Sequence, residues 1–130
     1  MKSWLLAAAV AAAVAGGSAC NRDPAGGAVD GATVYSMLCA TCHGPDGRPS
    51  AAMVARLAVR DLTAPELRAR IAASGPGLVE QQVRHGSKLM PAFEGAISDA
   101  QIRAVAAYVA SPGFPGGSPG GSAGSAAAPR

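Results

Sequence analysis

Aromatic residues are scarce in this 130-residue chain: they make up 4% of it, and the single tryptophan, Trp4, lies near the N-terminus. A core must therefore be built from aliphatic side chains, or from a group that the chain does not encode. Alternation of apolar and polar residues is absent, which argues against strands. The net charge is +3, or +2 without Lys2, and no basic stripe studded with aromatics accompanies it. Nucleic acid is therefore not an expected partner.

The first residues have the layout of a secretory signal peptide, which we place at 1–20. Lys2 precedes an uninterrupted apolar run over 4–15, and small residues follow it. This run is too short to span a bilayer as a helix, which needs about 20 residues. A buried N-terminal helix is the alternative. The signal peptide predicts export, and so a periplasmic location.

Two cleavage positions are open. Ala-Val-Ala at 13–15 offers an ordinary site with small residues at its first and third positions, whereas Gly-Ser-Ala-Cys at 17–20 resembles a bacterial lipoprotein signal, in which the cysteine is lipidated and becomes the new N-terminus. Cys20 is the odd one of three cysteines, and an unpaired thiol in an exported protein needs an explanation. A lipid on Cys20 would anchor the protein to a membrane. Otherwise Cys20 is incidental to a leader that is cut elsewhere.

Composition divides the remainder into a linker over 21–29, a helical domain over 30–111 and a disordered tail over 112–130. The tail consists mostly of Gly, Ser, Pro and Ala and cannot bury enough apolar surface to become ordered. The domain has roughly 80 residues, a size at which burial alone gives marginal stability. A buried porphyrin would supply the apolar volume that the aromatic residues do not.

Four helices are predicted before the last one. Asp30 caps the first, which continues through Cys39 and Cys42 and ends at Gly44. A short helix or a turn over 50–57 follows. Thr63 is the expected N-cap of a helix over 64–73, with Glu66 completing a capping box. The fourth covers 78–85.

The last helix has the clearest pattern. Ser98 and Gln101 form a capping box, and apolar residues recur at helical spacing after it. This apolar face consists of Ile102, Val105, Ala106 and Val109. The predicted fold class is all-α, without internal repeats.

The pentapeptide Cys-Ala-Thr-Cys-His at 39–43 is the attachment pattern of c-type haem. Two thiols three residues apart on a helix lie on one side of it, where they can reach the two vinyl groups of a porphyrin. His43 follows directly and can place its imidazole on the iron. We therefore predict one covalently bound haem c on Cys39 and Cys42, with His43 as a metal ligand.

Cysteine motifs of this kind have three other uses. A redox cysteine pair belongs with a βαβ pattern, which is absent. A zinc site would combine Cys39, Cys42 and His43 with the distant His85, which is not the usual zinc spacing. A disulfide between cysteines three residues apart would be strained and would close almost no loop.

The sixth position on the iron has few candidates. Met90 is favoured, because Pro91 follows it and stiffens the loop that would hold the thioether. His85 is the main alternative. If it is not a ligand, it is expected to be a surface residue near a helix end, where a positive charge is favourable. Met53 is weaker, and Met37 is expected in the core. An open sixth position is also considered.

The chain resembles a class I c-type cytochrome from residue 31 to about 109. The resemblance rests on Gly31 and Tyr35 before the haem cysteines, on Val105 and Tyr108 in the last helix, and on the Met90-Pro91 dipeptide. It implies the cytochrome c fold, in which the N- and C-terminal helices cross beside the haem. The nearest candidate for the backbone acceptor that orients the axial histidine is Pro49. Arg60 is a candidate partner for a haem propionate.

This resemblance implies a carrier of single electrons, not an enzyme, working in an exported electron-transfer chain. Its partners would be redox proteins, and it would act as a monomer or as a subunit of a respiratory complex. Arg84 and Lys88 flank the ligand loop and are candidates for steering an acidic partner. The alternatives are a haem enzyme or gas sensor with an open iron, and a zinc or structural module.

Overall fold

The computed structural model describes residues 23–115, so the predicted signal peptide, Cys20 and most of the predicted tail lie outside the described residues. Within this range the chain is helical and contains no strand, only two isolated bridges, so the all-α class is confirmed. No helix in the described part is both long enough and apolar enough to cross a membrane. The elements, in order, are α1 (Gly31–Val34), η1 (Tyr35–Cys39), α2 (Ala40–His43), α3 (Ala51–Leu57), α4 (Pro65–Ser74), α5 (Gly77–His85) and α6 (Asp99–Ala110).

The N-terminal helix is continuous but changes its winding. Asp30 caps it as predicted, since its carboxylate accepts a hydrogen bond from the Thr33 N–H. After α1 the chain takes one turn of π-helix, η1, before it returns to α-helix in α2. The π turn holds one more residue than an α turn, so the Ala40 N–H bonds to the carbonyl of Tyr35, five positions back. The cysteine motif is thereby rotated relative to the residues of α1.

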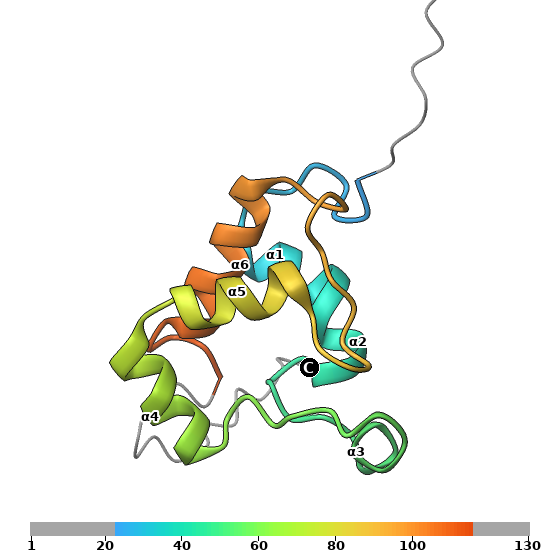
Figure 1. The fold of residues 1–130 in the computed structure, drawn as a ribbon, viewed down its shortest axis with the longest axis vertical. Helices are drawn as coiled ribbons and strands as arrows, with labels where there is room; N and C mark the ends of the chain where they lie inside the picture. Colours follow the sequence, from blue (N-terminus) through green and yellow to red (C-terminus); the bar gives the residue numbers. More distant parts are fainter. Residues whose placement is uncertain (1–22, 116–130) are drawn as a thin grey trace, which may run out of the picture.

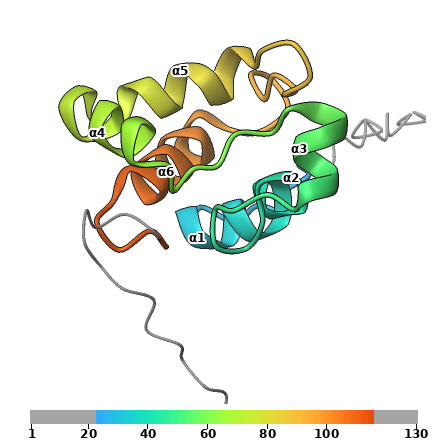
Figure 2. The same cartoon turned by 90° about the horizontal axis from the view of Figure 1, so that it is seen from below.

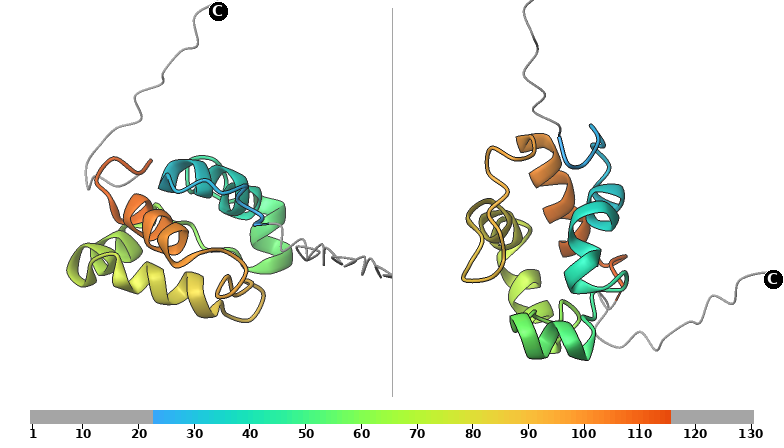
Figure 3. Two further views of the ribbon diagram at one scale, coloured as in Figure 1. Left: turned by 90° about the horizontal axis from the view of Figure 1, so that it is seen from above. Right: turned by 90° about the vertical axis from the view of Figure 1, so that its right-hand side faces the viewer.

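The C-terminal helix α6 forms as its pattern predicts. Ser98 and Gln101 make both hydrogen bonds of the capping box. The four apolar residues of the predicted face are buried, with Ile102 and Ala106 fully so. Figures 2 and 3 show α6 between α5 on one side and the N-terminal helix on the other.

The centre of the fold is the crossing of α1 and α6 (Figure 1). The two helices approach so closely at Gly31 that a Cβ there would collide with the Ala104 carbonyl and lie 2.8 Å from the Cβ of Tyr108. Tyr35, one turn further along, packs its ring against that of Tyr108 with centroids 5.6 Å apart. The predicted crossing of the terminal helices is therefore confirmed.

The middle helices also follow the prediction, except for one cap. Ser50 caps α3 through the Met53 N–H, and Gly86 ends α5. The capping box predicted for α4 is wrong: Ala64 is its N-cap, and no side chain caps it. Thr63 is occupied elsewhere, because its hydroxyl and its N–H both donate to one oxygen of Asp61, at 2.6 and 2.7 Å. Pro65 at the first helical position, which needs no N–H partner, begins α4 instead.

Part of the predicted linker belongs to the core. Ala25 is fully buried, and Asp23 accepts a hydrogen bond of 2.7 Å from the side-chain amide of Gln101. The same carboxylate accepts from the N–H groups of Ala25 and Gly27. Residues 23–28 therefore form a turn that covers the start of α6.

The core also continues past the predicted end of the domain at residue 111. Phe114 is only 2% exposed and packs against both tyrosines, at centroid distances of 5.3 Å from Tyr35 and 5.4 Å from Tyr108. The sequence did not predict that Phe114 is buried, because a single aromatic residue among Gly, Ser and Pro does not produce a periodic pattern.

We expect the Gly31→Ala variant to lose about 1–3 kcal/mol of unfolding free energy, because the added methyl group must push the two helices apart. Gly77→Ala is the matched control. Gly77 lies in the first turn of α5, and a Cβ there meets nothing within 4 Å. The control should stay within about 0.5 kcal/mol of the parent protein. Denaturant unfolding of both variants measures the difference, and equal losses would contradict the role of the crossing.

Candidate haem site

The two cysteines of the motif are free thiols in the described structure, half-buried at the end of η1 and within α2. Burial, helped by the neighbouring Cys42, raises the pKa of Cys39 to about 11. Such a thiol is neutral at physiological pH, whereas the nucleophile of a redox cysteine pair has a lowered pKa. The raised pKa argues against the redox-pair alternative.

His43 is the last residue of α2, and its ring is held by the backbone of a distant segment. Its Nδ1 lies 3.1 Å from the carbonyl oxygen of Arg60. A carbonyl can only accept, so Nδ1 carries the proton and Nε2 presents its lone pair. Burial lowers the pKa of His43 and outweighs the opposite effect of the Arg60 carbonyl. The ring is thus a neutral imidazole, the form that binds metal ions.

The sequence did not identify the acceptor for this histidine. Pro49 was the nearest candidate, but the bond goes to Arg60, 17 residues after the histidine. Every residue has a backbone carbonyl, so no sequence signal could have selected this one. The orientation of the ring depends on where the chain returns after α3.

The turn that follows His43 is fixed from two sides. Gly44 has a φ of +78°, and a side chain there would collide with the carbonyl of Arg48. The Tyr35 hydroxyl donates a hydrogen bond of 2.8 Å to the Gly44 carbonyl. At the end of the turn, the Gly47 carbonyl accepts from the Leu62 N–H at 2.8 Å. This last bond joins the turn to the segment that contains Arg60.

Met90 lies in a tight turn that is closed by two backbone hydrogen bonds. The N–H of Ser87 donates to the Met90 carbonyl at 3.0 Å, and the N–H of Met90 donates to the Ser87 carbonyl at 2.7 Å. Gly86 has a φ of +64°, and a Cβ there would meet the backbone of Met90 and Pro91. Met90 is half-buried and packs against the same core cluster as Cys39. The geometry of the loop holds this thioether in a defined place.

One side chain makes a polar contact with the thioether. The Gln82 amide nitrogen, on α5, lies 3.5 Å from the Met90 sulfur and 3.0 Å from the Ser87 hydroxyl. It can donate one N–H to each. The pattern of the sequence did not point to Gln82, because a glutamine on an exposed helix face is unremarkable.

The other candidates for the sixth position lie in different settings. His85 is exposed, with its Nδ1 3.7 Å from a carboxylate oxygen of Glu94. Met53 is half-buried in α3. The placement of Met37 in the core is wrong, since this residue is 47% exposed. Met37 lies two residues after the buried Tyr35, which is about half a helical turn, so its side chain is on the side away from the core.

A zinc site finds no support in the described part of the chain. Among residues 23–115, no three His, Cys, Asp or Glu side chains gather closely enough to hold a metal ion. The set proposed for zinc, which would join His85 to the motif, does not assemble. The donors that are present suit haem instead: two free thiols on one helix, an oriented neutral imidazole and a held thioether.

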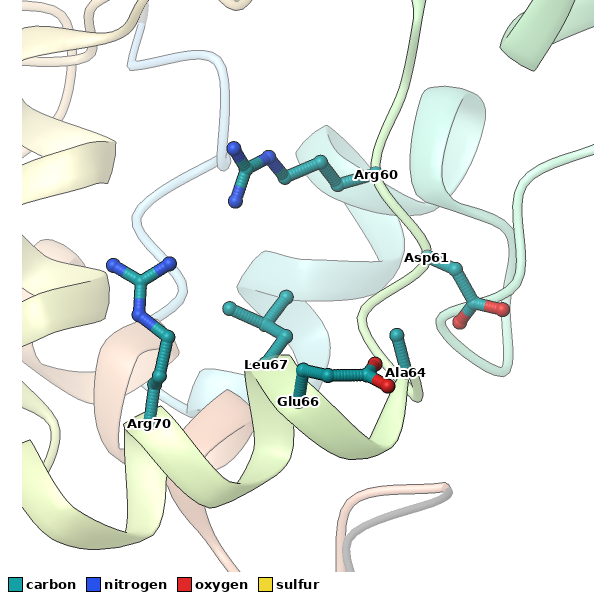
Figure 4. A pocket seen from close by; sticks show the side chains of 6 residues that line it. All are labelled: Arg60, Asp61, Ala64, Glu66, Leu67 and Arg70. Carbon is teal, nitrogen blue, oxygen red and sulfur yellow. The ribbon is translucent and has the colours of Figure 1, made fainter.

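A shallow pocket of about 240 Å³ lies beside the segment that holds His43. Arg60 contributes its carbonyl to His43 and its side chain to this pocket. Figure 4 shows the guanidinium groups of Arg60 and Arg70 reaching the same side of it, with Leu67 between them. The remaining lining residues are Asp61, Ala64 and Glu66.

Arg84 is not free to steer a partner, contrary to expectation. Its guanidinium bonds to Asp99 at 2.7 Å and to Glu80 at 2.9 Å, and its side chain is 19% exposed. The hydrogen bond that Arg84 donates to Asp99, followed by those it donates to Glu80, raises the pKa of Arg84. This arginine ties α5 to the start of α6. Lys88 remains exposed on the ligand loop.

Comparison with known proteins decides the family. The family model described as "Cytochrome C oxidase, cbb3-type, subunit III" matches residues 26–109. The chain belongs to this family of c-type cytochromes. Its proteins carry one covalently bound haem c, so the predicted cofactor and the cytochrome c fold are confirmed.

Individual relatives agree with the family. Cytochrome c6 of Synechococcus sp. strain PCC 6312 is 36% identical over 80 residues, which cover 62% of this chain and 65% of that protein. Cytochrome c6 of Parathermosynechococcus lividus is 35% identical and is covered to 84%. The KustC0563 c-type cytochrome matches in structure with a TM-score of 0.54 and 26% identity, over 62% of this chain and 94% of its own. The chain thus spans slightly less than two thirds of the Synechococcus relative.

The hydrogen bond behind His43 gives a testable prediction. Burial raises the pKa of Tyr35, so its hydroxyl stays protonated and donates to Gly44. The Tyr35→Phe variant should lose about 1 kcal/mol of unfolding free energy, because the Gly44 carbonyl then keeps only its longer bond of 3.3 Å from the Gly47 N–H. Tyr108→Phe is the control: its ring packs in the same cluster, but its hydroxyl bonds to no residue in 23–115. Thermal unfolding that shows no difference between the two variants would refute the prediction.

Proposed function

We propose that this protein is a carrier of single electrons, with haem c bonded to Cys39 and Cys42 and with His43 and Met90 as the two axial ligands. The observation that carries the proposal is the state of His43. It follows two free thiols at the attachment spacing, it is neutral, and its Nδ1 is engaged by the Arg60 carbonyl, so Nε2 is available to a metal.

The bound haem would supply one-electron redox chemistry, and the chain would set its conditions. The carbonyl of Arg60 keeps the His43 ring in one tautomer and one orientation. The turn at 87–90 holds the Met90 thioether, which raises the reduction potential relative to a second histidine. With two protein ligands on the iron, no position remains for a substrate, which favours a carrier over an enzyme or gas sensor.

We also assign Arg60 and Arg70 as partners for the haem propionates. Both guanidinium groups reach the same side of the pocket next to the His43 support (Figure 4). Arginine pairs well with carboxylates because its planar fork presents several N–H donors. No tryptophan is available for this contact after the leader, since Trp4 is the only one in the chain.

Export and tethering belong to the same proposal. The signal peptide predicts a periplasmic protein, and a lipid on Cys20 would keep it at a membrane. Its partners would be a redox donor and a redox acceptor, and Lys88 is the exposed cation on the ligand loop that could face an acidic one. The protein would work as a monomer or as a subunit of a respiratory complex, and the description of the matching family supports the second of these.

Optical spectroscopy of the protein, exported from a host that attaches c-type haem, tests the assignment of Met90. The parent protein should show a sharp reduced α-band, a weak near-infrared sulfur-to-iron band when oxidised, and no response to carbon monoxide. The Met90→Ala variant should lose the near-infrared band and bind carbon monoxide, because its sixth position is open. Met53→Ala is the matched control and should behave as the parent protein.

Other outcomes would point elsewhere. A parent protein without the near-infrared band and without gas binding would transfer the sixth position to His85. Carbon monoxide binding by the parent protein would favour an enzyme or a gas sensor. Absence of haem in the exported protein would refute the proposal.

Gln82 provides a second test of Met90. An N–H donated to the thioether withdraws electron density from it and so destabilises ferric iron relative to ferrous iron. We therefore expect Gln82→Leu to lower the reduction potential. The control is Gln81→Leu, at an exposed neighbouring position on α5. Redox titration of both variants is the measurement, and equal potentials would show that the amide does not act on the ligand.

A further inference from the structure

The segment after α6 is folded back onto the body of the protein. The N–H and the hydroxyl of Ser111 both donate to the Tyr108 carbonyl, at 3.1 and 2.7 Å. The Phe114 N–H then donates to the Ser111 carbonyl at 3.2 Å. These bonds form a turn that returns the Phe114 ring to the interior, where it is 2% exposed.

A buried arginine holds this turn in place. Arg68, on α4, is 8% exposed. Its guanidinium donates to the carbonyl of Val109 at 2.6 Å and to that of Ser111 at 3.2 Å. It also lies 5.5 Å from the centre of the Phe114 ring, within the range of a cation–π contact. Two hydrogen bonds and one cation–π contact with the same planar guanidinium group leave the segment little freedom.

The ring of Phe114 covers a junction between two other segments. A Cβ on Gly47 would lie 2.7 Å from the Cε1 of Phe114 and 3.3 Å from the Cγ2 of Thr63. Gly47 has a φ of +82°, so neither its conformation nor its space favours a side chain. Phe114 thus closes against the end of the turn 44–47 and next to the segment 60–63.

These two segments are the support of His43. One begins at Gly44, directly after the histidine, and the other contains Arg60, whose carbonyl accepts the Nδ1 proton. The bond from the Leu62 N–H to the Gly47 carbonyl joins them beneath the Phe114 ring. A change at Phe114 therefore reaches both sides of the histidine through short, continuous contacts.

We propose that Phe114 is a positioning residue for His43, acting through the turn 44–47 and the segment 60–63. The proposal rests on the proposed function, in which His43 is the axial ligand. A well-formed bond to the Arg60 carbonyl makes the imidazole a stronger donor and stabilises ferric iron. Removal of Phe114 loosens this bond, so the reduction potential rises and the Nδ1 proton exchanges faster.

The experiment uses the full-length haem protein with isotopically labelled histidine. Phe114→Ala and Phe114→Leu are compared with the parent protein by redox titration and by NMR of the His43 ring. We expect Phe114→Ala to raise the reduction potential. We also expect exchange of the Nδ1 proton with solvent to become about tenfold faster, because the hydrogen bond that protects this proton is weakened. Phe114→Leu retains an apolar filling and should give a smaller change of the same sign.

Two controls separate positioning from general loss of stability. Ile102→Ala removes a fully buried side chain in the first turn of α6, at the other end of that helix. It should lower the unfolding temperature without moving the potential. A chain that ends at Pro115 keeps the Phe114 turn and should match the parent protein in both measurements.

The outcomes are distinguishable. If the parent protein lacks iron-shifted signals from the His43 ring, the axial assignment fails, and the proposed function fails with it. If those signals are present but Phe114→Ala behaves as Ile102→Ala does, the positioning role alone is overturned.

Discussion

The contact between Gly31 and the Ala104 carbonyl is the constraint on which the arrangement of the helices depends. It lets α1 and α6 cross without intervening side chains, and the ring of Tyr35 then meets that of Tyr108. Because α6 also packs against α5, one crossing determines where the cysteine helix and the helix before the methionine loop lie. Close approach of backbones requires a residue without a Cβ, which is why one glycine has so large an effect on so small a core.

The environment of His43 is assembled from parts of the chain that are far apart in sequence. The helix that carries it ends at Gly44, whose carbonyl is held by Tyr35 from within the same helix. The segment after α3 supplies the carbonyl of Arg60, and the segment after α6 closes over both through Phe114. Burial lowers the pKa of the ring and keeps it neutral. A small domain with few aromatic residues thus concentrates three of them in one cluster, in which Tyr35 and Phe114 contact the turn that follows His43.

Sequence reasoning succeeded where one local rule decided the outcome. The caps at Asp30 and Ser98 and the apolar face of α6 were predicted because capping and periodicity act within a few residues. It failed where contacts that the local rules do not include decided the position of a residue. Thr63 could cap α4 but bonds to Asp61, and Met37 lies within the π turn, two residues after the buried Tyr35 and on the opposite side of the helix. Ala25 and Phe114 lie in segments of linker-like composition, and only their distant neighbours explain why they are buried.

The sequence by itself determined the cofactor: the spacing of Cys39, Cys42 and His43 indicates haem c. The reason is that haem attachment requires two thiols and an imidazole on one short stretch of helix. The sequence also determined the helical class, through periodic apolar residues. Only the tertiary structure decided what orients those groups. The acceptor for His43 is a backbone carbonyl and the donor to the Met90 sulfur is one exposed glutamine among two, and neither carries a distinguishing residue type. Such contacts depend on the positions of segments that meet only after folding.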